Sequence, residues 1–306
     1  MKKKRLKSII KVIKASRVQR STYAILSIFI AASFVNTLNK PVIILAFLSV
    51  LFYSVGGLQN AIKDKDYMIN KKILPISILI IIITSLIITN FNYKIILLIP
   101  IVLLLTFFYN TYSRKILFMD LITMSFTHIT IPFLATLWIL NKPIIPYVKY
   151  PIFMALSFIL IINTKNMSGF LEDKKRGYVT LMTKFKSGKF LILLSVILGI
   201  ILLIVNALIL KNYPLNPLLL LIILIPSFFL LKDITQLRGK NATILARMVF
   251  VILILGYLVQ NKPSIKITAL SFLSSFIFIK QGLYTISTEI KQSKFYRQPL
   301  KSLFSL

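Results

Sequence analysis

Long apolar runs alternate with short polar segments along most of the chain. Runs such as 73–90 and 190–210 approach the ~17–25 residues that a bilayer-spanning helix needs. The pattern predicts helical spans at 22–38, 41–59, 73–90, 94–109, 116–140, 147–163, 189–210, 215–232, 243–260 and 265–280. Because Ser271, Ser274 and Ser275 interrupt the last run, it either crosses the membrane or lies at the interface. We therefore expect an all-α, polytopic transmembrane bundle of nine to ten spans.

The composition supports a membrane protein. The chain is 57% hydrophobic with a mean hydropathy of +0.86, whereas soluble globular domains are about 45–50% apolar. Cysteine is absent, so neither a disulfide framework nor a thiolate site can form. These values exclude an ordinary soluble domain.

The net charge of +31 raises the question of nucleic-acid binding. However, Lys and Arg gather in alternate segments between the predicted spans, at 1–21, 60–72, 110–115, 163–189, 232–247 and 280–306. Such an alternation is the positive-inside pattern of membrane proteins. It predicts a multi-pass integral membrane protein with a cytoplasmic N-terminus and the lipid bilayer, not nucleic acid, as its partner. A prokaryotic plasma membrane is the expected location.

Three regions are expected along the chain. Residues 1–21 carry Leu6, Ile9, Ile10 and Ile13 at helical spacing, which predicts a basic amphipathic segment in the headgroup region. A basic tail without structure is the alternative. The bundle is expected over 22–260, and 261–306 would hold a possible tenth span and a cytoplasmic tail.

Two polar segments on the predicted cytoplasmic side contain four of the acidic residues and are candidate parts of a site. Segment 60–72 contains Asp64 and Asp66, and segment 163–181 contains Glu172 and Asp173. Carboxylates beside lysines suit a Mg²⁺–phosphate site, because Mg²⁺ takes few protein carboxylates together with substrate oxygens. The alternatives are a solvated charged turn for the first segment and a topogenic basic loop for the second.

Further polar candidates lie near the ends of the apolar runs or within them. Tyr109, Arg114 and Lys115 close the fourth run, where the two cations would either hold phosphate oxygens or anchor the interface. Asp120 and His128 fall within the fifth predicted span, and ionisable groups inside a membrane are functional candidates. Alternatively, Asp120 reaches the headgroup region, and His128 is a lone histidine of the helical core.

Several motifs resemble those of the UbiA superfamily of intramembrane prenyltransferases, over about residues 10 to 260. Residues 173–181 (DKKRGYVTL) resemble the family's D-(R/K)-K-x-G-x-x-T-L, and residues 109–115 (YNTYSRK) are similar to its Tyr-then-Lys segment. Residues 60–64 (NAIKD) resemble the start of N-D-x-x-D-x-x-x-D, and the stretch from 70 to 75 resembles the following N-K-P-x-R-P. The chain departs from the family where acids are expected, at Ala61, Met68, Asn166 and Gly169. The acidic motifs are therefore eroded.

The resemblance implies Mg²⁺-dependent transfer of a polyprenyl group from an allylic prenyl diphosphate. It makes Asp64 and Asp173 the catalytic residues and places the metal on Asp64, Asp66, Glu172 and Asp173. The remaining implied binding residues are Asn60, Asn166, Tyr109, Arg114, Lys115 and Lys174. All of this requires the inner ends of the second and sixth spans to meet around one site.

The acceptor stays open between an aromatic ring, as in quinone or tocopherol-like biosynthesis, and a glycerol-phosphate lipid, as in archaeal membranes. Two other functions remain. Loss of acids favours a non-catalytic isoprenoid-binding relative. A small-molecule membrane transporter is the third hypothesis, although transporters tend to carry ionisable groups near the bilayer midplane, and nearly all acids here fall in polar segments.

Overall fold

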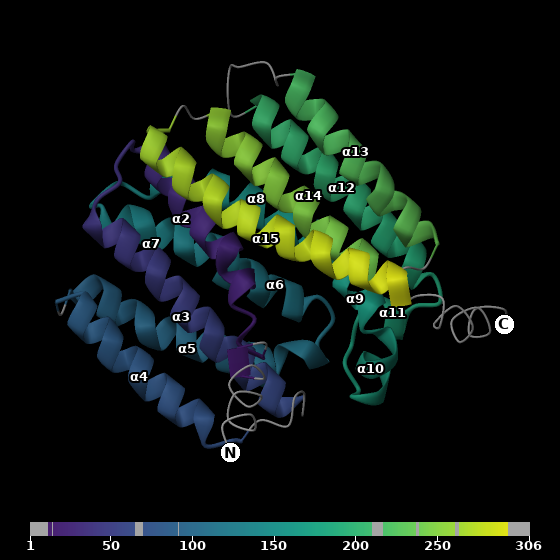
Figure 1. Cartoon of the computed structure of the whole chain (residues 1–306), viewed down its shortest axis with the longest axis horizontal. Helices are drawn as coiled ribbons and strands as arrows, with labels where there is room; N and C mark the ends of the chain where they lie inside the picture. The colour runs from purple at the N-terminus through teal and green to yellow at the C-terminus, as the bar shows by residue number, and fades with distance from the viewer. Residues whose placement is uncertain are drawn as a thin grey trace. The chain divides into compact units, whose positions relative to one another are not determined.

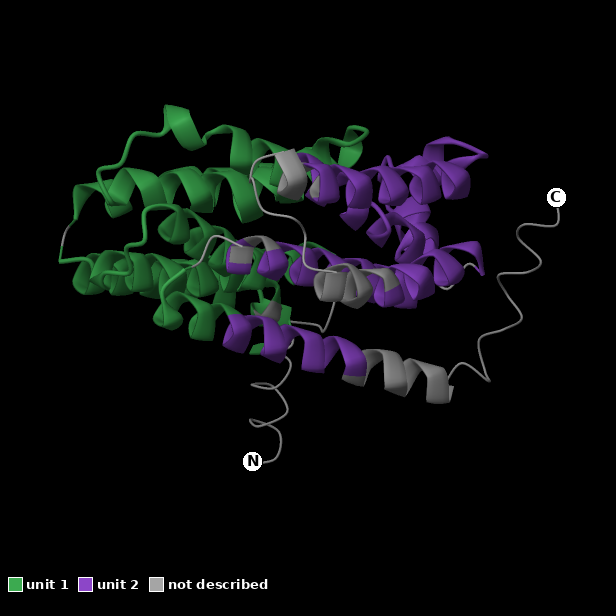
Figure 2. Cartoon of the chain, turned by 90° about the horizontal axis from the view of Figure 1, so that it is seen from above, with its two compact units in different colours: residues 1–155, 261–271 green, residues 156–260, 272–306 purple. Residues whose placement is uncertain are grey.

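A computed structural model describes residues 12–13, 15–64, 70–90, 92–209, 217–236, 239–260 and 263–292. Within these residues the regular structure is entirely helical, which confirms the all-α prediction (Figure 1). The chain divides into two compact units (Figure 2). Unit 1 comprises residues 1–155 and 261–271, and unit 2 comprises residues 156–260 and 272–306.

Each expected span coincides with a helix or with a series of consecutive helices. Unit 1 contains η1 (Val18–Ser21), α2 (Thr22–Phe34), α3 (Lys40–Lys63), α4 (Ile73–Ile88), α5 (Tyr93–Thr111), η3 (Ser113–Lys115), α6 (Met119–Ser125), the π-helix η4 (Phe126–Thr130), α7 (Ile131–Ile139) and η5 (Ile145–Tyr147). The fifth expected span is thus α6, η4 and α7 in succession. Its interruption by a π turn is not apparent from the apolar pattern.

The helices of unit 2 lie in the second half of the chain. They are α9 (Lys165–Ser168), α10 (Phe170–Lys175), α11 (Leu181–Lys184), α12 (Gly188–Ile209), α13 (Pro217–Thr235) and α14 (Gly239–Gln260), and the unit shares α8 (Lys149–Ile162) and α15 (Ile265–Gln292) with unit 1. The rings of Phe158 and Phe250 meet edge to face at 5.1 Å in its core. Helix α15 continues well past residue 280, where the expected span ends.

Four helical stretches among the described residues are long and apolar enough to cross a membrane. They are Lys40–Lys63, Tyr93–Lys115, Met119–Ile139 and Ile145–Ser168. Shorter apolar helices occur at Thr22–Phe34, Ile73–Ile88, Gly188–Leu202 and Asn241–Gly256. The lengths and apolar compositions of these helices support the expectation of membrane association.

Helix α4 has an exposed apolar face. Its apolar residues Ile76, Ile80, Ile83 and Ile87 are 47–70% exposed and follow one another at spacings of three or four, so they form one stripe. A large exposed apolar stripe on a helix is unfavourable in water. Hydrocarbon chains of a bilayer are its natural surroundings.

The N-terminal segment packs against α3 at one glycine. Ala15 is fully buried and forms a cluster with Leu58 and Ala61 of α3. A Cβ at Gly57 would lie 2.3 Å from the carbonyl oxygen of Ser16, which is far inside van der Waals contact. Glycine therefore allows residues 15 and 16 to cover this end of α3.

We expect Gly57→Ala to destabilise unit 1, because the added methyl group collides with backbone that cannot simply rotate away. Overpacking of this kind costs about 1–3 kcal/mol and should lower the melting temperature in detergent. Gly56→Ala is the matched control, since its Cβ would meet no backbone and only side-chain atoms of Thr106, the nearest at 3.2 Å. Equal melting temperatures for the two variants would contradict this account of Gly57.

Candidate functional site: a cavity in unit 1

A cavity of about 140 Å³ lies within unit 1, among α2, α3, α5, α7 and the η4 turn. Helix α3 lines it from Leu45 to Asn60, which at 1.5 Å per residue is a length of about 22 Å. Leu45, Ser49, Tyr53, Gly56 and Asn60 face the cavity at spacings of three or four residues, so they occupy one side of the helix. The cavity is therefore long and follows a single helix face.

The two ends of this cavity differ in chemistry. Near Leu45 its walls are apolar, formed by Leu98 of α5 and by Pro132 and Ala135 of α7. Near Asn60 they are polar and basic, formed by Arg17, Arg20, Asn60, Tyr109 and Asn110. A molecule with an apolar body and an anionic end would match this gradient.

Asn60 is the most unusual polar residue in the cavity wall. It is 4% exposed, and neither its Nδ2 nor its Oδ1 atom has a hydrogen-bond partner among the described residues. Buried amide groups are nearly always satisfied in folded proteins. Because Asn60 lines the cavity, its donor and its acceptor are both available to a bound molecule.

Arg17 reaches the polar end by an uncommon backbone conformation. Its φ of 51° and ψ of 35° lie in the left-handed region, immediately before η1. This conformation is unfavourable for residues other than glycine, and such residues cluster at functional sites. The turn carries Arg17 and Arg20 to the cavity wall.

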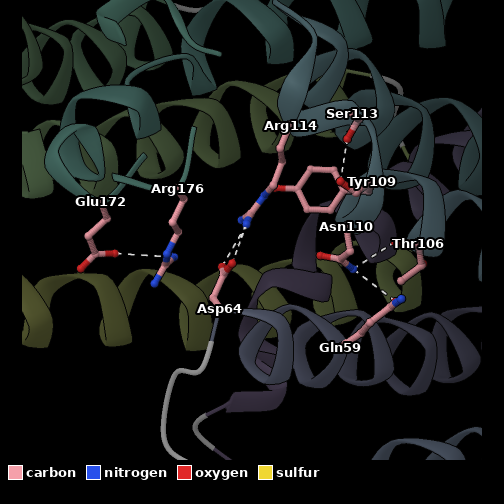
Figure 3. A network of polar contacts seen from close by, with 9 residues as sticks. All are labelled: Gln59, Asp64, Thr106, Tyr109, Asn110, Ser113, Arg114, Glu172 and Arg176. Atoms are coloured by element: carbon pink, nitrogen blue, oxygen red, sulfur yellow. Dashed lines mark hydrogen bonds and ion pairs between the residues drawn. The ribbon is translucent and has the colours of Figure 1, made fainter. Parts of the chain in front are cut away.

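A second asparagine ties α5 to α3 at the same end (Figure 3). The Nδ2 atom of Asn110 donates hydrogen bonds to Oε1 of Gln59 at 3.2 Å and to the carbonyl oxygen of Thr106 at 3.0 Å. Its Oδ1 atom is buried without a partner among the described residues. The amide thus fixes the two helices and leaves an acceptor at the cavity.

The predicted residues Asp64, Arg114 and Tyr109 come together beside this end (Figure 3). Nη1 of Arg114 donates to both carboxylate oxygens of Asp64, at 2.9 and 3.1 Å, and the side chains are 3% exposed for Asp64 and 16% for Arg114. The guanidinium also lies 5.4 Å from the ring centroid of Tyr109. Asp64 is therefore engaged by an arginine, while the predicted Lys115 is exposed.

The predicted Mg²⁺ ligands do not form a cluster within the described part of either unit. No group of three His, Cys, Asp or Glu side chains suited to a metal ion occurs among the described residues. In the described part of unit 1, Asp64 lies beside the cavity end and is held by Arg114, whereas the predicted Asp66 lies outside the described residues. The unit 1 residues alone do not fit Mg²⁺, and the full set, which includes Glu172 and Asp173 of unit 2, stays a prediction.

The second predicted segment is described within unit 2. Glu172 and Arg176 of α10 form an exposed i,i+4 ion pair at 3.8 Å, and Lys174 is exposed. Asp173 is half-buried, and its carboxylate lies over Gly169, 3.3 Å from where a Cβ would be. An acid at position 169, as in the family motif, would therefore stand directly beside Asp173.

Two residues of the 173–181 motif have clear structural roles. Gly177 adopts a φ of 67° after α10, and the N–H of Tyr178 donates to the carbonyl of Asp173 at 2.9 Å, which is a Schellman helix end. Gly177 therefore ends α10. Thr180 caps α11 in a reciprocal capping box with Thr183. The motif's glycine and threonine are thus explained by helix termination and initiation.

Asn166 belongs to a buried amide network of unit 2. It is 3% exposed, and its Nδ2 donates to Oδ1 of Asn163 at 2.6 Å. Asn163 in turn donates to Ser195 of α12 at 3.4 Å. The network connects the α8–α9 turn to α12, and a ligand-binding role for Asn166 stays a prediction.

The two intramembrane candidates differ in position. Asp120 is buried in the first turn of α6, where its Oδ1 accepts from the N–H of Leu121 at 2.8 Å and where a helix N-terminus favours negative charge. His128 lines the cavity on the η4 turn, opposite Tyr53 of α3. Only the histidine is part of the candidate site.

Arg17, Arg20, Tyr53 and Asn110 line the cavity but are not predicted from the sequence. One signal for Tyr53 exists, because Tyr53, Gly56 and Asn60 recur at helical spacing along an otherwise apolar run. Comparison with protein-family models, curated proteins and solved structures finds no match for this chain. The UbiA resemblance therefore stays a prediction based on the motifs alone.

We expect Arg114→Met to destabilise the protein by about 3–5 kcal/mol, because it leaves the buried Asp64 carboxylate uncompensated. Arg176→Met is the matched control, since removal of an exposed ion pair costs under about 1 kcal/mol. Thermal unfolding in detergent measures both. The double variant Asp64→Asn/Arg114→Met should recover most of the loss, and a double variant no more stable than Arg114→Met would contradict the pairing.

Proposed function

We propose that the cavity of unit 1 binds an isoprenoid diphosphate and that the protein transfers its polyprenyl group to an aromatic or lipid acceptor. The observation that carries the proposal is the gradient along α3, from a basic, polar end at Asn60 to an apolar end at Leu45. A prenyl diphosphate carries a strongly anionic group at one end of a hydrocarbon chain, which matches this gradient.

Charge at the polar end supports an anionic ligand. Arg17 and Arg20 line the cavity, and Lys63, Arg114 and Lys115 form one electrostatic group with Asp64 beside it. The described cations at this end therefore outnumber the carboxylates. Arginine is well suited to hold phosphate oxygens because its guanidinium donates in a planar fork.

The volume limits what the cavity holds. The cavity of about 140 Å³ is similar in volume to an engineered apolar cavity of about 150 Å³ that binds benzene. The reacting ends of the two substrates would occupy it, with the diphosphate at its polar end and the rest of each substrate outside it. This separates the reacting carbon from water.

The proposed chemistry follows from these surroundings. As the bond between the allylic carbon and the diphosphate oxygen breaks, negative charge grows on the leaving group and positive charge on the carbon. Fixed donors at the polar end stabilise the growing negative charge, which is usually the largest electrostatic contribution to catalysis. The apolar walls exclude water that would otherwise capture the cation.

The proposal includes a membrane arrangement and a cofactor. The protein would be a UbiA-like bundle of nine to ten spans with a cytoplasmic N-terminus, which places the polar end of the cavity at the cytoplasmic face. Mg²⁺ on Asp64, Asp66, Glu172 and Asp173 belongs to this proposal as well. Assays with and without Mg²⁺ test it directly.

The Asp64–Arg114 pair also favours a second function. A carboxylate that is 3% exposed and bonded through both oxygens to arginine contributes to stability without any metal. A protein that binds an isoprenoid diphosphate without transferring it would need the cavity and this ion pair alone. Binding without release of diphosphate distinguishes it from the enzyme.

We expect Arg17→Ala and Arg20→Ala each to weaken binding of geranylgeranyl diphosphate by about 10- to 100-fold, because each removes a hydrogen bond to a charged group. Binding of the labelled compound to protein in detergent gives the affinity. Geranylgeraniol, which lacks the diphosphate, should bind equally well to all variants. Lys142→Ala, which alters an exposed cation away from the cavity, is the control.

The same preparation tests transfer. Release of diphosphate in the presence of phenolic and glycerol-phosphate acceptors should depend on Mg²⁺ and should fall at least ~10²-fold in Asp64→Ala and Asp173→Ala if these carboxylates position the metal. Binding without any release would establish the non-catalytic function. Absence of both binding and release would overturn the proposal.

A further inference from the structure

The π-helical turn in the fifth apolar run gives the cavity a histidine. Residues Phe126–Thr130 form η4 between α6 and α7, and π turns within helices occur frequently at functional sites. His128 is 7% exposed and lines the cavity. A buried imidazole at the wall of a cavity is in position to exchange a proton with a ligand.

One tautomer of His128 satisfies the contacts around its ring. The hydroxyl of Thr127 lies 3.0 and 3.1 Å from the backbone carbonyl oxygens of Thr123 and Met124, which can only accept. When its hydrogen is donated to a carbonyl, its oxygen accepts from Nδ1–H of His128 at 2.7 Å. The other nitrogen, Nε2, therefore carries a lone pair and accepts from the hydroxyl of Tyr53.

Tyr53 connects this imidazole to the cavity. Its ring stands edge-on to the imidazole, with centroids 4.7 Å apart and an interplanar angle of 84°. It lies seven residues before Asn60 on the cavity face of α3, or about 10 Å deeper at 1.5 Å per residue. Gly56, between them, presents only backbone. A diphosphate at Asn60 would place its first carbon near Gly56, next to the tyrosine hydroxyl.

We propose that Tyr53 and His128 form a proton-accepting site for the hydroxyl group of the acceptor, most directly a phenol. This inference rests on the proposed function and specifies the acceptor's position in the same cavity. The acceptor hydroxyl donates to the oxygen of Tyr53, and Tyr53 donates to Nε2 of His128. Tyr53 would be the residue that touches the acceptor, and His128 would act through it.

The reaction balances with the groups named. The acceptor oxygen forms a bond to the allylic carbon, whose bond to the diphosphate oxygen breaks, and the electron pair of that bond leaves with the diphosphate. The acceptor's proton passes to Tyr53 as the proton of Tyr53 passes to Nε2 of His128. The products are the prenyl ether, diphosphate and an imidazolium, which loses its proton to solvent after release.

Binding of a matched pair of probes tests the site without any diphosphate. Isothermal titration calorimetry would compare 4-pentylphenol with 4-pentylanisole, in which a methyl ether replaces the hydroxyl. We expect the wild type to prefer the phenol by about 10-fold, from one buried hydrogen bond. The preference should vanish in Tyr53→Phe and persist in His128→Gln, whose amide oxygen still accepts from Tyr53. Ser54→Ala, next to Tyr53 but not in the cavity wall, should match the wild type.

Transfer then separates proton acceptance from binding. His128→Gln should lower transfer to 4-pentylphenol by at least ~10²-fold, the usual contribution of general-base catalysis, while it keeps the preference for the phenol over the ether. Equal wild-type affinities for phenol and ether overturn the proposal without needing any variant, as does full transfer by His128→Gln. Failure to bind the diphosphate would instead reject the proposed function and leave the phenol preference as the test of this site.

Discussion

The buried ion pair between Asp64 and Arg114 holds the ends of α3 and α5 together, and the cavity lies between these helices. Removal of two charges from water is unfavourable unless each is hydrogen-bonded as well as paired. Here both carboxylate oxygens accept from the guanidinium, and Tyr109 provides an aromatic face beside it. The pair therefore fixes the ends of these two helices against each other.

Polar residues next to this ion pair are ordered by their position along α3. Asn60 comes first, followed by the bare backbone of Gly56 and Gly57, then Tyr53, and finally Leu48 and Leu45. Because the helix advances about 1.5 Å per residue, this order sets the distance of each chemical group from the polar end. A single helix face thus determines where an anionic group, a reacting carbon and an apolar chain would lie.

The sequence predicts the helices well because each apolar run is long and each break is strongly polar. The UbiA resemblance places Asp64, Arg114 and Tyr109 in one site, and these three residues, at the ends of the second and fourth runs, do lie together. Tyr53 and His128 could not be paired in advance, since their contact depends on the register set by the η4 turn. Arg17 depends on a left-handed backbone conformation that no local pattern in residues 15–20 indicates.

In the 173–181 motif, the residues that carry the family resemblance are partly the same residues that the local fold needs. Gly177 ends α10 in a left-handed conformation, and Thr180 begins α11 through a capping box, so both residues are needed for the local fold. Their presence therefore favours a shared backbone geometry more strongly than a shared reaction. Asp173 is the member of this motif that capping does not require, because its contribution to the helix end is its backbone carbonyl. The case for catalysis consequently depends on carboxylates and on the cavity, and much less on the glycine and threonine that make the motif recognisable.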